Sequence, residues 1–220
     1  MIRPGDEWGE LTDATPDVIV RGDDTALAAV AVAHSESIPL VRFLPDGSEL
    51  ARAVGVTSPT EGSEPRGIAL PVDAIVTEGG TAMNLVVLGT APASLHVWHR
   101  SHRLTVTVDG RAVHEGRATA VVVANGQFSG AADLVPRGHP GDGRLEVQVY
   151  GLRPGERSAM RRRLGTGTHV PHPRIVTASG RSVRVDGVGH PWPVTLDGRP
   201  VGRFPGLTAT VRHPALRLLI

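Results

Sequence analysis

The sequence predicts an α+β protein in which a truncated N-terminal α/β unit precedes a larger, β-rich antiparallel sandwich. Three observations support this class. Short β-branched runs recur along the 220 residues, separated by 27 Gly and 18 Pro. Few segments have a helical pattern, and most of those lie before residue 57. Asp-Gly pairs follow alternating apolar runs at Asp109-Gly110 and Asp197-Gly198, which indicates hairpin turns.

The first 57 residues have the order of a crossover unit. We expect a strand at Val18–Val20, a helix at Asp24–His34, a strand at Leu40–Phe43 and a short helix at Glu49–Val54. Strand–helix–strand order is typical of a parallel sheet, because parallel neighbours need a crossover connection. About 17 residues precede the first strand, which is too few for another such unit.

A stretch rich in Pro, Gly, Ser and Glu, Thr57–Gly67, predicts a linker. We therefore expect an α/β domain at residues 1–57 and a β-rich domain at residues 58–220. One helix is expected in the second domain, at Pro154–Leu164, because Pro lies near its start and three Arg residues lie in its last turn. The strands expected there are Leu85–Leu88, Leu104–Val108, Ala120–Ala124, Leu145–Val149, Ser182–Val185 and Leu207–Val211.

The composition excludes several kinds of chemistry. The chain has no Cys, so disulfides, thiolate catalysis and zinc–thiolate sites are ruled out. All 23 basic residues are Arg, which excludes Schiff-base and phosphate-binding lysines. The net charge of +1 gives no reason to expect a nucleic-acid partner. Without a secretory pattern or a long apolar run, we expect a cytoplasmic protein with no stable membrane insertion.

Several motifs follow one another in order along most of the chain. They are Val18–Thr25 (VIVRGDDT), Leu44–Arg52 (LPDGSELAR), Val121–Ala132 (VVVANGQFSGAA), Pro140–Val147 (PGDGRLEV), Gly167–His169 (GTH) and Val194–Gly202 (VTLDGRPVG). Together they resemble the motifs of the diacylglycerol kinase-like lipid kinases. The resemblance implies a two-domain fold with a C-terminal β-sandwich, in which residues 1–57 are a remnant of the nucleotide-binding domain.

The resemblance also implies where a cleft lies and which residues line it. The nucleotide-binding candidates are Gly22, Asp23, Thr25 and Asn125, and the catalytic candidates are Asp142, His169 and Asp197. The two carboxylates, with Glu146, would suit acid–base chemistry if their loops converge. His169 would add a group that titrates near neutral pH. The Asp-Gly pairs are also good turn formers, and a single His is more often structural. No residue is assigned to a metal.

Departures from the family pattern bear on phosphoryl transfer. Asp24 stands where the family has Gly, which adds a Cβ and a negative charge where the phosphates of ATP are expected. Two like charges a few ångströms apart cost on the order of 1 kcal/mol when exposed and more when shielded. Arg199 stands where the family has a Glu proposed as the base, and arginine cannot accept that proton. Ser48-Glu49 replaces an Asn-Asp pair in a shortened second loop.

We therefore expect a degenerate lipid kinase-like protein that binds or transforms a hydrophobic or amphipathic small molecule without ATP or Mg²⁺. An isomerase or cyclase of specialised metabolism would fit, and whether the protein is an enzyme stays open. One alternative is an ATP- and Mg²⁺-dependent lipid kinase acting on a diacylglycerol-like alcohol. A second alternative is a non-catalytic binding or regulatory module. Because a truncated sheet exposes an edge strand, a homodimer through that edge is also expected.

Two further clusters have both a functional and a structural interpretation. His96, His99 and His102 are spaced by three residues. A loop could gather the three rings around a metal, since imidazole suits zinc. A polar surface loop in a His-rich protein is the more common explanation of such a pattern. Arg161–Arg163 could bind an anion, or could form a solvated last turn of a helix that the helix dipole favours.

Overall fold

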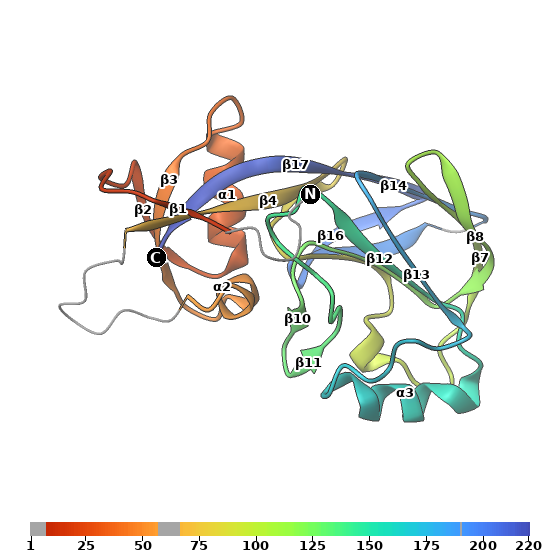
Figure 1. Cartoon of the computed structure of the whole chain (residues 1–220). Coiled ribbons are helices and arrows are strands. Elements are labelled where there is room, and N and C mark those ends of the chain that lie inside the picture. The colour runs from red at the N-terminus through yellow and green to blue at the C-terminus, as the bar shows by residue number, and fades with distance from the viewer. Residues whose placement is uncertain (1–7, 57–66, 190) are drawn as a thin grey trace.

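The computed structural model describes residues 8–56, 67–189 and 191–220. Two long strands, β4 (Ile68–Thr77) and β17 (Gly206–Leu219), run from a small N-terminal lobe into a β-sandwich (Figure 1). The predicted α+β class is therefore confirmed. The predicted linker falls almost entirely on residues 57–66, outside the described residues.

The N-terminal lobe is the predicted crossover unit. Its elements in chain order are β1 (Glu10–Leu11), β2 (Val18–Gly22), α1 (Asp24–Ala33), β3 (Leu40–Pro45) and α2 (Glu49–Ala53). Strands β2 and β3 pair in parallel, with Val18 opposite Val41. Leu27 of α1 and Leu50 of α2 are buried against the same apolar cluster, which explains why both helices pack on this sheet. Among the described strands, β2 pairs with β3 alone, and its Ile19 is 63% exposed.

Strand β17 makes this lobe part of a nine-stranded sheet. The first half of β17 lies between β4 and β14 (Ser182–Gly187), where all neighbours are antiparallel. Beyond a register shift between Arg212 and Leu216, the strand lies between β4 and β3, and it is parallel to β3. The α/β unit thus extends one sheet of the sandwich, and the division at residue 57 stays a prediction.

The sandwich packs that sheet against a second, six-stranded one. The remaining strands of the first sheet are β5 (Gly80–Ala82), β7 (His102–Val108) and β8 (Arg111–Ala118). The second sheet has the order β13 (Ile175–Gly180), β12 (Leu145–Tyr150), β9 (Ala120–Ala124), β6 (Leu85–Gly89), β15 (Trp192–Leu196) and β16 (Arg199–Phe204). Alternate residues of β12, such as Val147, face Val106 and its neighbours across the core.

The outer face of the second sheet is also covered. Tyr150 and Val122 point away from the sandwich core and pack against Met160 and Leu164 of α3 (Arg157–Leu164). A 3₁₀ turn, Pro154–Glu156, precedes α3. The other short elements on this side are η1 (Pro92–Ser94), β10 (Phe128–Ser129) and β11 (Ala132–Asp133). Figure 1 shows α3 below the strands of this sheet. None of the helices in the described part of the chain is long and apolar enough to cross a membrane.

Both predicted hairpin turns are present. Asp109 and Asp197 have positive φ angles of 47° and 46°, and the glycine after each has φ 79°. Positive φ at both central residues is the geometry of a type I′ turn, which suits the twist of a two-residue hairpin. Asp197 therefore lies in the sharp turn that follows β15, where its side chain can bond to a neighbouring segment.

Candidate functional site

The N-termini of α1 and α2 lie where the lobe meets the sandwich, and an acidic side chain accepts backbone N–H groups at each of them. Asp23 is the N-cap of α1. Its Oδ1 accepts hydrogen bonds from the backbone N–H groups of Thr25 at 3.0 Å and Ala26 at 3.2 Å. This is the standard chemistry of an Asp N-cap, which satisfies donors that a helix leaves unpaired.

Asp24 reaches across to the other helix. Its carboxylate accepts the hydroxyl of Ser48 and the backbone N–H groups of Glu49 and Leu50, both at 3.2 Å. Asp24 is 5% exposed. Burial raises its pKa to about 6, although Ser48 opposes the shift, and the nearby charge of Asp197 raises the pKa further. A helix N-terminus is a ready-made anion site, and at α2 the protein's own carboxylate occupies it.

Asp197, a predicted catalytic residue, holds the connection between β5 and β6. Its Oδ2 accepts the N–H of Met83 at 2.8 Å, and its Oδ1 accepts those of Asn84 at 2.9 Å and Leu85 at 2.8 Å. Burial raises the pKa of Asp197, while these three donors act in the opposite direction. Both oxygens are thus already engaged, and its catalytic role stays a prediction.

Three predicted nucleotide-binding residues come together at the start of α1. Gly22, Asp23 and Thr25 line a shallow, open pocket with Arg199. The guanidinium of Arg199 donates to Asp23 Oδ2 at 3.0 Å, and both side chains are partly exposed. An ion pair this exposed contributes at most about 1 kcal/mol, so Arg199 remains available to an anion that enters the pocket.

Asn125, the fourth such residue, is buried behind this region. Its Nδ2 donates to the carbonyl of Asp73 at 2.9 Å and to that of Met83 at 2.8 Å. Asn125 therefore ties β4 to the same connection that Asp197 holds. Asn84 lies in that connection and donates to the carbonyl of Phe128 at 3.0 Å. Asn84 was not among the predicted site residues, although a single amide side chain within an apolar run indicates a buried polar group that needs hydrogen-bond partners.

Helix α2 also contacts the β10–β11 hairpin. Glu49 Oε1 accepts the N–H of Gly130 at 3.0 Å, and Arg52 donates to the carbonyl of Gly130 at 2.8 Å. The guanidinium of Arg52 lies 3.9 Å above the centre of the Phe128 ring. The shortened second loop therefore leads to a helix that is docked directly on the sandwich.

Asp142 belongs to a second acidic cluster. Burial raises the pKa values of Asp73 and Glu146, and the charge of Asp142 raises both further. Asp73 is fully buried, with Oδ1 2.6 Å from His213 Nδ1 and Oδ2 accepting the N–H of Gly143 at 2.8 Å. The sequence analysis did not single out Asp73, although an Asp within an apolar strand was a signal for it.

The acidic residues are thus divided between two places. Asp142 precedes Gly143, whose N–H bonds to Asp73 Oδ2, and its charge raises the pKa values of Asp73 and Glu146. The acidic neighbours of Asp197 are Asp23 and Asp24, so the third member of the expected cluster of Asp142, Glu146 and Asp197 has other acidic groups beside it. Asp197 contributes its charge to the helix N-termini instead.

His169 lies on the outer side of the second sheet. Its Nε2 is 3.3 Å from Gln148 Oε1 and 3.4 Å from the hydroxyl of Tyr150, which donates to the same Gln148 oxygen at 2.5 Å. No hydrogen bond or ion pair among the described residues joins His169 to Asp142 or Asp197. Glu146 and Gln148 line an adjoining pocket.

We expect His169 to stay neutral at pH 7, because burial lowers its pKa. Because the folded protein favours the neutral ring, the neutral form of His169 contributes to the free energy of unfolding. This contribution is complete above about pH 6.5, the pKa of an unfolded His, and is lost as the pH falls through the lower pKa of the folded state. A proton NMR titration of the ring checks this. A midpoint at or above that of an unfolded histidine, about 6.5, would contradict it.

The three histidines of residues 96–102 do not converge. His99 Nδ1 accepts the backbone N–H of His96 at 2.9 Å, which closes a turn, and the ring of His102 lies edge-on to Trp192. In the part of the chain that the structure describes, no group of three His, Asp or Glu side chains is placed to hold a metal ion.

Comparisons with known proteins agree with this architecture. The family model described as "YegS C-terminal NAD kinase beta sandwich-like domain" matches residues 69–220. A diacylglycerol kinase from Bacillus anthracis str. Sterne has a TM-score of 0.70 at 18% identity, over 92% of this chain and 76% of its own. A yeast NADH kinase in complex with NADH has a TM-score of 0.54 at 14% identity, over 92% of this chain and 61% of its own. No curated protein matches the sequence.

Proposed function

Because this chain belongs to the diacylglycerol kinase-like lipid kinase family through its YegS-type β-sandwich domain, we propose that it uses the kinase scaffold to bind an amphipathic small molecule without ATP. The observation that carries the proposal is the carboxylate of Asp24 at the N-terminus of α2. A phosphate would need the same backbone donors.

Electrostatics and hydrogen bonding oppose ATP at this junction. Asp23 caps α1, and Asp24 accepts N–H groups at the start of α2 beside its N-cap, Ser48. The negative charges of both aspartates would repel a triphosphate. Displacing Asp24 would break its bonds to Ser48, Glu49 and Leu50. Each such bond to a charged group contributes about 1.5–3 kcal/mol. The binding energy of ATP would have to offset these losses.

The pocket beside Glu146 suits an amphipathic ligand. Val135, Val170 and Pro171 supply apolar walls, and the polar groups come from Arg137, Glu146, Gln148, Thr177 and Ser179. Pockets that combine apolar walls with convergent polar groups are typical of small-molecule sites. Burial raises the pKa of Glu146, which would suit this carboxyl to proton transfer in an isomerase- or cyclase-type reaction.

Calorimetric titration with ATP-Mg²⁺ tests the proposal, and we expect no micromolar binding by the unaltered protein. Asp24→Gly restores the family's residue and frees the N-terminus of α2, so this variant should gain measurable affinity for ATP or pyrophosphate. Asp46→Gly, at an exposed position of the pocket lined by Gly22, Asp23 and Thr25, is the matched control and should gain none. Micromolar binding of ATP-Mg²⁺ by the unaltered protein would overturn the proposal.

The open pocket of Gly22, Asp23 and Thr25 favours a second candidate, an ATP-dependent lipid kinase. In that case Arg199 would contact a phosphate instead of Asp23. Incubation with labelled ATP and a panel of diacylglycerols and sphingoid bases separates the two candidates. Transfer of label would favour the kinase, and its absence together with a lack of ATP binding would favour the ATP-independent protein.

A further inference from the structure

The pocket beside Glu146 is a cavity of about 440 Å³ on the outer face of the second sheet, over strands β12 and β13. Glu146 of β12 lies opposite Ser179 of β13 in the register of the sheet. Gln148, two residues further along β12, lies opposite Thr177. Opposite residues of paired strands point to the same face, so these polar side chains together form the floor of the cavity.

The amide of Gln148 is held in one orientation by two buried groups. Its Oε1 accepts the hydroxyl of Tyr150 at 2.5 Å, and the ring Nε2 of His169 lies 3.3 Å from the same oxygen. Tyr150 is 0% exposed and His169 is 1% exposed, so water does not compete for this oxygen. The oxygen end of the amide is therefore directed away from the cavity.

The nitrogen end of the same amide has no acceptor of this kind. In the part of the chain that the structure describes, no group accepts a hydrogen bond from Gln148 Nε2. Gln148 is 3% exposed and lines the cavity, so the small accessible part of its side chain faces that space. A buried donor without an acceptor is destabilising. The acceptor for this N–H must therefore enter from the cavity.

The charges around this donor favour a neutral acceptor. Burial lowers the pKa of His169 and raises that of Tyr150, so both groups beside Gln148 are uncharged at pH 7. An anion at Gln148 would exchange its hydration for uncharged donors and would lie on the same floor as Glu146, and both effects are unfavourable. An alcohol would bring a hydrogen that needs an acceptor of its own, whereas Oε1 of Gln148 is already engaged. A carbonyl oxygen meets neither difficulty.

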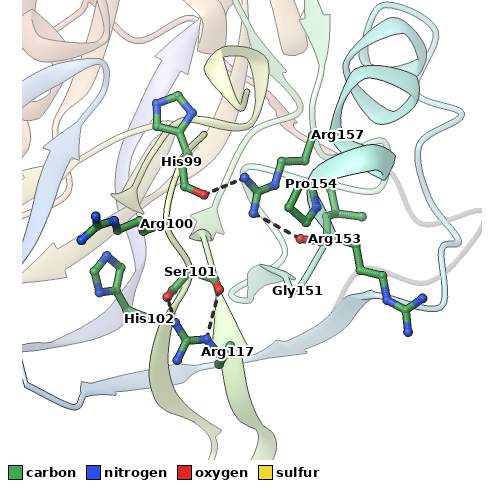
Figure 2. Close-up of a pocket in the computed structure, with 10 residues that line it drawn as sticks. His99, Arg100, Ser101, His102, Arg117, Gly151, Arg153, Pro154 and Arg157 are labelled. Atoms are coloured by element: carbon green, nitrogen blue, oxygen red, sulfur yellow. Dashed lines mark hydrogen bonds between the residues drawn. The ribbon is translucent and has the colours of Figure 1, made fainter. Parts of the chain in front are cut away.

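A second hollow, beside α3, lacks such convergence. Figure 2 shows the side chains of Arg100 and Arg153 on opposite sides of it, directed away from each other. The guanidinium of Arg157 is directed at the backbone, where it donates to the carbonyls of His99 at 2.7 Å and Leu152 at 3.4 Å. These bonds fix the loop of His99 to α3, which is a structural role.

We propose that Gln148 determines which ligand the cavity accepts, by donating its amide N–H to a carbonyl oxygen of a neutral, largely apolar molecule. The apolar part of this molecule contacts Val135 and Val170, which line the same cavity. Tyr150 is a positioning residue, because its hydroxyl holds the amide oxygen away from the ligand. The inference rests on the proposed function, since it names the class of molecule that binds beside Glu146.

Three probes that share one rigid hydrocarbon cage test this selection on the full chain. Adamantanone carries a neutral carbonyl, adamantane carboxylate is an anion, and amantadine is a cation at pH 7. Each is titrated into the protein while the signals of the side-chain amides are followed by NMR. Adamantanone should bind most tightly of the three, and its binding should shift the amide protons of Gln148 downfield, as expected for a new hydrogen bond.

The variants establish whether the amide is responsible. Gln148→Met keeps the length of the side chain without the donor, so it should weaken the binding of adamantanone about fivefold, the contribution of one neutral hydrogen bond. Tyr150→Phe keeps the donor but releases its orientation, so it should weaken binding less. Thr177→Val removes an exposed hydroxyl opposite Gln148 on the same face. As the matched control, it should leave binding unchanged.

Three results would overturn the proposal: binding of the carboxylate or of amantadine as tight as that of adamantanone, an unchanged affinity in Gln148→Met, or no binding of any probe. If Gln148→Met does not fold, the amide signals of the unaltered protein decide, and signals that stay in place at saturation with adamantanone count against it. The titration with ATP-Mg²⁺ is independent of these readouts, so a failure of the proposed function is distinguished from a failure of selection by Gln148.

Discussion

Asp197→Ala is expected to lower the free energy of unfolding by about 3–5 kcal/mol, because it leaves three backbone donors unpaired and each such loss costs about 1–3 kcal/mol. The carboxylate binds three backbone N–H groups, of Met83, Asn84 and Leu85, and the substitution leaves them buried without acceptors. Alanine also tolerates the positive φ of 46° at this position poorly. Urea denaturation, followed by circular dichroism, measures the loss.

Two variants show whether the carboxylate itself is responsible. Asp197→Asn keeps one acceptor oxygen and a side chain that tolerates positive φ, so it should cost less than alanine. Asp142→Ala removes a half-buried carboxylate that accepts one backbone N–H, from Arg144 at 3.0 Å, and it should cost about 1 kcal/mol. If Asp197→Ala were as stable as the unaltered protein, the carboxylate would have no structural role and its predicted catalytic role would gain support.

Local patterns predicted most of the fold. The β-branched runs gave the positions of β6, β7, β9 and β12, and the Asp-Gly pairs gave two hairpins, because these signals depend on neighbours in the sequence. Strand β4 was not predicted, since Pro71 and Asp73 interrupt its apolar run. Asp73 is tolerated there only because Gly143 and His213 bond to it from 70 and 140 residues away. Such distant partners leave no local signal.

The sequence motif indicated which residues lie at the start of α1, but it did not indicate which groups their side chains contact. Gly22, Asp23 and Thr25 gather in one pocket as the motif implied. The sequence also showed that Asp24 replaces a glycine, but it could not show which way the carboxylate points. Its partners lie 24 to 26 residues further along, and only the packing of α1 against α2 brings them together. The charge is therefore buried as a cap on α2.

This burial makes Asp24 the source of a pH-dependent stability. Its pKa is about 6 in the folded protein, against about 3.9 for an unfolded Asp. Between these values the folded state binds more protons than the unfolded state, so the free energy of unfolding falls as the pH rises from about 4 to about 6. The separation of roughly 2 pH units corresponds to about 3 kcal/mol.

Asp24→Asn removes this titration while keeping an oxygen that can accept a hydrogen bond at the N-terminus of α2. The stability of the unaltered protein relative to this variant should therefore be about 2 kcal/mol greater near pH 4, where an unfolded Asp is itself about half protonated, than near pH 7. Urea denaturation at intervals across this range measures the difference. Asp46→Asn makes the same chemical change at an exposed position before α2 and should keep the slope of the unaltered protein. A constant difference between Asp24→Asn and the unaltered protein would mean that the carboxylate titrates alike in the folded and unfolded states, which its burial beside Asp197 would not allow.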